Sequence, residues 1–107
     1  MKFDNQKINK FVMLSHMSII MAKEVCKRKI ISDTNEINIM ARDLLYDLCE
    51  SMNLSDIRDW IATDGAEFGK SIIDSTTKDE EYMSQVTNYT HKIMRRGDMM
   101  MNGGGWA

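Results

Sequence analysis

Apolar residues recur at steps of three and four along most of the chain, and this spacing predicts amphipathic helices. No stretch shows the two-residue alternation of a credible β-strand. We therefore predict an all-α fold, a compact bundle of four to five helices. The expected helices span about residues 5–28, 34–52, 56–63, 65–75 and 78–96.

The clearest amphipathic pattern lies between Asp33 and Asn53, and we expect the other segments to pack around this helix. Its apolar stripe consists of Ile37, Met40, Ala41, Leu44, Leu45, Leu48, Cys49 and Met52. Asp33 and Glu36 have the spacing of a capping box, in which side chains bind the free N–H groups of the first turn. Asn53 tolerates the left-handed conformation that ends many helices.

The later helices carry comparable signals at their ends. The expected N-terminal caps are Ser55, Asp64 and Thr77, with Glu67 and Glu80 completing the spacing of the last two. Gly97 is the expected end of the last helix. Residues 1–97 should then form one helical domain, and residues 98–107 (DMMMNGGGWA) a flexible tail.

The segment 5–28 is apolar nearly all round in its middle. One stripe contains Ile8, Phe11, Ser15, Ile19, Ala22 and Cys26, and a second contains Met13, Met17, Ile20 and Met21. Such a helix is either central in a bundle or covered on its second side by another subunit. Because 107 residues offer few helices to cover both stripes, we expect self-association through the second one. Trp106, at the end of a flexible lead, is a further candidate for filling a partner's pocket.

The net charge of −2 conceals a strong asymmetry along the chain. Residues 1–29 hold seven basic and two acidic side chains. Residues 30–81 hold four basic and thirteen acidic side chains, and residues 82–107 hold three basic side chains and one acidic. Two helix ends are basic, and their residues are Lys23, Lys27, Arg28 and Lys29 at one and Lys92, Arg95 and Arg96 at the other. These cations either complement the C-terminal helix dipoles or bind phosphate groups of a ligand or nucleic acid. If the first and last helices run parallel, all seven share one end of the bundle; if antiparallel, about 30 Å separates them.

Acidic residues form a line on the outer face of the 34–52 helix, namely Glu36, Asp43, Asp47 and Glu50. The line is either a solvated face or a site for a cation or a basic partner. One enzymatic alternative places Mg²⁺ between Asp43, Asp47 and Glu50 and an acidic group from the 65–75 helix, Glu67 or Asp74. This set resembles the sites of small all-helical nucleotide pyrophosphohydrolases, but their paired E-x-x-E and E-x-x-D pattern is absent.

Metal binding by histidine motifs, disulfide bonding and DNA reading by a helix-turn-helix find little support in the sequence. His16 and His91 have no Cys, His or Glu three or four residues away, so neither begins a zinc or di-iron motif. We expect His16 to be a buried or interface histidine with a satisfied hydrogen bond. Cys26 and Cys49 are too few for a disulfide framework and should be free, mostly buried and about 20 Å apart. The 56–75 region resembles a helix-turn-helix, but its second helix is net acidic and poorly suited to DNA.

We therefore expect an intracellular, cytoplasmic protein that binds rather than catalyses, as an adaptor or inhibitor of another macromolecule and without a metal or cofactor. The apolar run at residues 11–22 is too short for a membrane span of about 20 residues and lacks a signal-peptide cleavage site. The proline-free, Lys-, Asn-, Ile- and Met-rich composition has the character of a phage-encoded accessory protein. The alternative function is binding of a phosphorylated ligand or nucleic acid through the basic helix ends.

Overall fold

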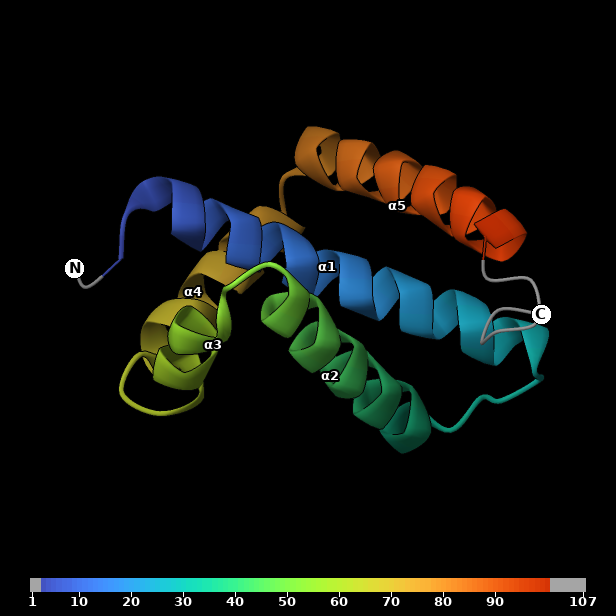
Figure 1. The fold of residues 1–107 in the computed structure, drawn as a ribbon, viewed down its shortest axis with the longest axis horizontal. Helices are drawn as coiled ribbons and strands as arrows, with labels where there is room; N and C mark the ends of the chain where they lie inside the picture. Colours follow the sequence, from blue (N-terminus) through green and yellow to red (C-terminus); the bar gives the residue numbers. More distant parts are fainter. Residues whose placement is uncertain (1–2, 101–107) are drawn as a thin grey trace.

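A computed structural model describes the backbone of residues 3–100 and the side chains of residues 3–96, and this part of the chain forms five helices (Figure 1). They are α1 (Asn5–Arg28), α2 (Thr34–Ser51), α3 (Ser55–Ala62), α4 (Ala66–Thr77) and α5 (Glu80–Met100). The all-α prediction is confirmed, and the expected helix bounds differ by at most two residues except at the end of α5.

The last helix passes through Gly97, where the sequence predicted its end, and continues to Met100. One glycine inside a helix costs only about 1 kcal/mol, which is not enough to stop it. The expected flexible tail therefore loses its first three residues to α5. Trp106 and the rest of the tail lie outside the described residues, so their expected role remains a prediction.

The helix around which the others pack is α1, not α2 as predicted. All four other helices contact α1, whereas α2 touches neither α4 nor α5. Along α2 only Ala41 and Cys49 are fully buried, while α1 buries residues on both of its apolar stripes. A helix with one stripe needs a single neighbour, but a helix with two stripes must have neighbours on both sides.

The direction of each helix follows from the residues that meet. The Cys26 sulfur lies 4.0 Å from that of Met40, near the turn that joins α1 to α2, so these helices form an antiparallel hairpin. The contacts between α1 and α5 show the opposite relation. His16 in the middle of α1 packs edge-on against Tyr82 at the start of α5, and Arg28 adjoins Arg95 further along. The first and last helices therefore run parallel, as Figure 1 shows.

The second stripe of α1 is largely buried, on the side of the helix that faces α5. Met17 and Met21 share a face with Glu24 and Arg28 by helical register, and they are only 3% and 5% exposed. The other two members of the stripe, Met13 and Ile20, are partly buried against the same core. Most of the surface predicted to drive self-association is thus buried within the chain, because α1 contacts all four of the other helices.

The turns after α1 and α2 share one geometry. In each, a backbone N–H closes onto a carbonyl five residues earlier: Ile31 onto Cys26 and Leu54 onto Cys49, each over 2.8 Å. The preceding residues have left-handed backbones, with φ of 59° at Ile30 and 57° at Asn53. Both turns are Schellman motifs. Asn53 was expected in this conformation, whereas a β-branched residue such as Ile30 adopts it rarely.

The helix starts confirm only some of the predicted caps. Asp33 caps α2 by accepting a hydrogen bond from the Asn35 N–H at 2.9 Å, as predicted, but the side chain of Glu36, the other half of the predicted capping box, forms no hydrogen bond with a described residue. The other predicted caps, Ser55, Asp64 and Thr77, are wrong: Leu54 and Gly65 precede α3 and α4, and Asp79 caps α5 instead. Leu54 is 3% exposed, so its burial in the core fixes where α3 begins.

Among the described residues, no helix has both the length and the apolar run that crossing a bilayer requires.

Candidate functional site

The two basic helix ends meet in the structure. Because α1 and α5 run parallel, Arg28 and Arg95 line the same surface pocket of about 250 Å³. The other lining residues are Glu24, His91 and Met94. By helical register, the remaining predicted cations lie within about two turns of this pair. We call the full set the basic end, and it comprises Lys23, Lys27, Arg28, Lys29, Lys92, Arg95 and Arg96.

Most cations of the basic end have no ion-pair partner. Apart from Arg28, none of their side chains forms a hydrogen bond or an ion pair within the part of the chain that the structure describes. All seven side chains are exposed. Like charges gathered at one end of a bundle repel one another, and a bound anion removes this repulsion.

Helix dipoles explain only part of this gathering. Lys27 and Arg28 lie in the last turn of α1, where the partial negative charge of the helix end stabilises cations. The last turn of α5 contains no basic residue, because that helix runs on to Met100. The dipole effect fades within one turn, so it does not account for Lys92, Arg95 and Arg96.

The pocket chemistry suits an anion that sits across the surface rather than deep inside. The guanidinium groups of Arg28 and Arg95 are planar forks that match phosphate oxygens. Met94, only 2% exposed, supplies an apolar wall. The carboxylate of Glu24 also lines the pocket and repels an anion that enters far.

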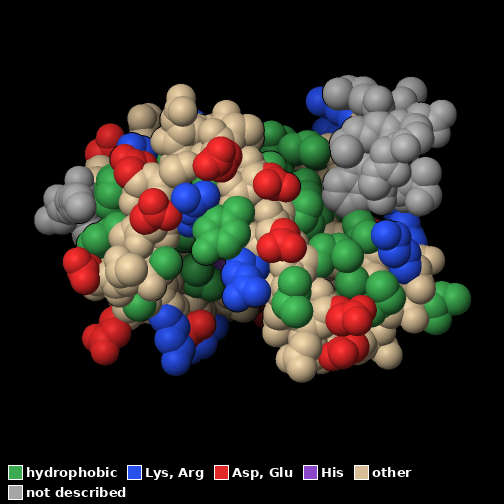
Figure 2. All heavy atoms as spheres, turned by 60° about the horizontal axis from the view of Figure 1, so that its bottom comes forward, with side chains coloured by type: hydrophobic (Ala, Val, Ile, Leu, Met, Phe, Trp, Pro, Cys, Tyr) green, Lys and Arg blue, Asp and Glu red, His purple; other side chains and the backbone are tan. Residues whose placement is uncertain are grey.

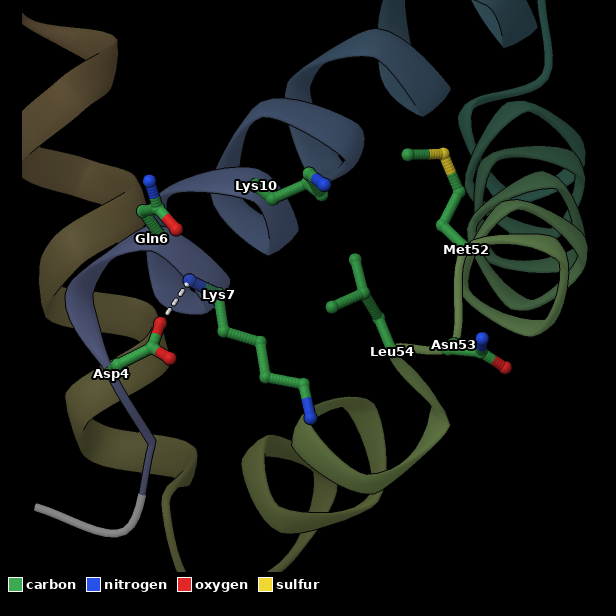
Figure 3. A pocket seen from close by; sticks show the side chains of 7 residues that line it. All are labelled: Asp4, Gln6, Lys7, Lys10, Met52, Asn53 and Leu54. Carbon is green, nitrogen blue, oxygen red and sulfur yellow. Dashed lines mark hydrogen bonds between the residues drawn. The ribbon is translucent and has the colours of Figure 1, made fainter.

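A second pocket lies between the start of α1 and the turn after α2, and no sequence signal indicated it (Figure 3). It measures about 440 Å³ and is lined by Asp4, Gln6, Lys7, Lys10, Met52, Asn53 and Leu54. Most of its charge is already engaged: Asp4 accepts from the Lys7 backbone N–H at 2.8 Å, and Lys7 Nζ donates to Asp56 at 2.7 Å. The latter hydrogen bond also lowers the pKa of Asp56. Lys10 is the remaining charged group, and one lysine does not make a strong site.

The acidic line on α2 borders a shallow apolar depression of about 470 Å³. The lining residues are Glu36, Ile39, Met40, Asp43, Leu44 and Asp47, so Glu50 is exposed but outside it. The proposed magnesium set is not assembled, since α2 and α4 do not touch and Glu67 and Asp74 stand apart. No group of three or more His, Cys, Asp or Glu in the described chain is placed to hold a metal ion.

The buried titratable groups are structural. His16 is 4% exposed, and burial lowers its pKa from 6.5. Its Nε2 lies 2.7 Å from Thr76 Oγ1, which confirms the expectation of a buried, hydrogen-bonded histidine. Both cysteines are free and buried, also as predicted. Burial raises the pKa of Cys49 to about 11, so its thiol is poorly nucleophilic at neutral pH.

No protein-family model matches the chain, and neither curated proteins nor solved structures show a significant similarity to it. The surface chemistry of the molecule must therefore support any functional argument.

Proposed function

We propose that this protein acts by binding rather than catalysis, and that its basic end contacts the phosphate backbone of a nucleic acid. The observation that carries the proposal is the parallel course of α1 and α5, which brings Arg28 and Arg95 into one pocket. Seven cations on two helices provide several phosphate contacts at once, whereas a single small anion would engage only a few of them.

The site favours backbone contact over base reading. The pocket between α1 and α5 has no Phe, Tyr or Trp among its described lining residues, so no platform for base stacking is present there. Residues 30–81 carry thirteen acidic against four basic groups and repel phosphate. The protein should therefore approach a nucleic acid with its basic end first and show little sequence preference.

Fluorescence anisotropy with labelled single- and double-stranded oligonucleotides tests this function. The association constant should fall linearly with salt on logarithmic axes, with a slope of about 0.7–0.9 per phosphate contact. Reversing two charges, Arg95→Glu with Arg96→Glu, should weaken binding at least about tenfold at low salt.

The matched control is Lys70→Glu with Lys78→Glu, which changes the net charge equally but lies on and just after α4. Its binding should stay within about twofold of the wild type. Equal weakening by both double variants would mean that only the net charge matters. An affinity that does not change with salt concentration would also contradict the proposal.

A second candidate function is that of an adaptor or inhibitor of another protein. The acid-bordered apolar depression on α2 supports it, whereas the second stripe of α1 supports it less because most of that stripe is buried within the chain. The two free cysteines favour an intracellular, reducing setting for either function.

A further inference from the structure

We propose that the outer face of α2 is a docking site for a cationic amphipathic helix presented by a partner protein. This docking face consists of the six residues that line the depression: Glu36, Ile39, Met40, Asp43, Leu44 and Asp47. It is separate from the basic end, which lies on α1 and α5, and it implies a second partner of opposite charge.

The floor of the docking face is apolar and accessible. Met40 and Leu44 are partly buried against the core, while Ile39 is 50% exposed. Tyr46, seven residues after Ile39, is 41% exposed, but the Arg58 guanidinium lies over its ring, 4.6 Å from the centroid, so the apolar surface ends there beside a cation. Figure 2, which turns the lower side of Figure 1 forward, shows hydrophobic side chains in the open with acidic and basic side chains around them. Contiguous exposed apolar surface bordered by polar groups is typical of interaction sites.

The border of the docking face selects the charge of the occupant. The carboxylates of Glu36, Asp43 and Asp47 are exposed and form no hydrogen bond or ion pair with any residue that the structure describes. Asp43 and Asp47 stand one helical turn apart, where like charges repel. Lysine or arginine side chains from a partner relieve this repulsion and gain three charge contacts.

The length of the docking face fits a helix as its occupant. Glu36 and Asp47 are eleven residues apart, about 17 Å along the helix axis. Three turns of a partner helix span that length, and apolar residues at its i, i+3, i+4 and i+7 positions reach the floor. The acidic border disfavours anionic lipid and nucleic acid. The chain's own basic helices already bury their apolar faces in the core, which disfavours a second copy as the occupant.

A synthetic helix of about 14 residues, with leucines on one face and lysines elsewhere, is the probe. Isothermal titration should show binding to the full-length protein, with the affinity reduced only partly by moderate salt. Two peptide controls separate the contributions. A version with glutamate for lysine tests charge, and one of equal composition but scrambled order tests the apolar face. Each should bind at least about tenfold more weakly, and equal binding of either would overturn the proposal.

Variants of the protein locate the probe. Asp43→Lys with Asp47→Lys should weaken binding roughly tenfold, while the matched reversal Glu67→Lys with Asp74→Lys on α4 should not. Ile39→Gln, which keeps a good helix former at an exposed position, should weaken binding several-fold. Arg95→Glu with Arg96→Glu should leave the affinity for the probe unchanged, so this test does not depend on nucleic-acid binding.

The proposal fails if the α2 reversal has no effect on the affinity for the probe. It also fails if sedimentation shows a dimer that Ile39→Gln dissociates, because a second copy then occupies the face.

Discussion

His16 Nε2 donates a hydrogen bond to Thr76 Oγ1 over 2.7 Å and so joins the middle of α1 to the last turn of α4. The direction follows from the Thr76 hydroxyl, which donates its one hydrogen to the carbonyls of Ile72 and Ile73 at 2.9 and 3.0 Å. Its oxygen is therefore the acceptor, and the neutral imidazole carries its proton on Nε2. The same ring packs edge-on against Tyr82, so one side chain links three helices.

Removing the acceptor should destabilise the fold. Thr76→Val keeps the shape but leaves the buried His16 N–H without a partner, which costs about 1–2 kcal/mol of unfolding free energy. Thr77→Val is the matched control, because the Thr77 hydroxyl is exposed and bonds only to its own helix at Ile73. Urea denaturation should show a change within about 0.5 kcal/mol for the control. Equal losses for the two variants would show that the link to His16 is unimportant.

The same histidine should make stability depend on pH. Burial lowers the pKa of His16 in the folded protein below its ordinary 6.5, so the unfolded chain binds the proton more readily. The contribution of neutral His16 to the free energy of unfolding is therefore complete above about pH 6.5, and it is lost as the pH falls from there through the folded-state pKa. Denaturation midpoints between pH 7.5 and about 5 should fall less steeply for His16→Gln than for the wild type. Parallel profiles would contradict this, since the carboxylates contribute to both.

Replacing Ile30 by glycine should stabilise the fold rather than destabilise it. Its φ of 59° is strained for a β-branched residue, and its side chain is 93% exposed, so glycine relieves the strain with little loss of burial. Ile30→Gly should raise the unfolding free energy by about 1 kcal/mol. At the equivalent Asn53, Asn53→Gly should gain less, because asparagine tolerates this conformation. A loss of stability in Ile30→Gly would show that the side chain makes a contribution that outweighs the strain.

Gly69 should reject even the smallest side chain. A Cβ at this position would lie 2.5 Å from Ile61 Cγ2, because α3 and α4 pack closely there. Gly69→Ala should therefore destabilise the protein by about 1 kcal/mol or more, although alanine is the better helix former. The cost should shrink in an Ile61→Leu background, which removes Cγ2. Ser71→Ala, at an exposed position of α4, is the control and should be neutral or slightly stabilising.

The sequence determined the five helices well but not their roles. The clean stripe of α2 made it the expected centre, yet one stripe means one buried side, and α2 lies at the edge. The two stripes of α1 were visible, but whether another helix or another subunit covers the second depends on where α3 and α4 direct the chain. That path depends on close contacts such as Gly69 against Ile61 and on the burial of Leu54, which have no local signature.

The candidate site was predictable in its residues but not in its assembly. The seven cations stand out in the sequence, and their meeting required only that α5 run parallel to α1. The sequence left both directions open, since two short helices can return the chain to either end. The depression on α2 was missed for a related reason: the acidic line was visible, but the accessibility of Ile39 between its members depends on how deeply α2 sits on α1.

The position of α1 against all four other helices has a consequence for a cleaved chain. A protease cut in the turn between α1 and α2 would release one helix from four others that otherwise touch only their neighbours along the chain, α2 with α3, α3 with α4 and α4 with α5. The two fragments would keep their structure only as a noncovalent complex. In that complex α1 acts as a ligand of the remaining chain, and the free energy of binding it is the free energy of folding.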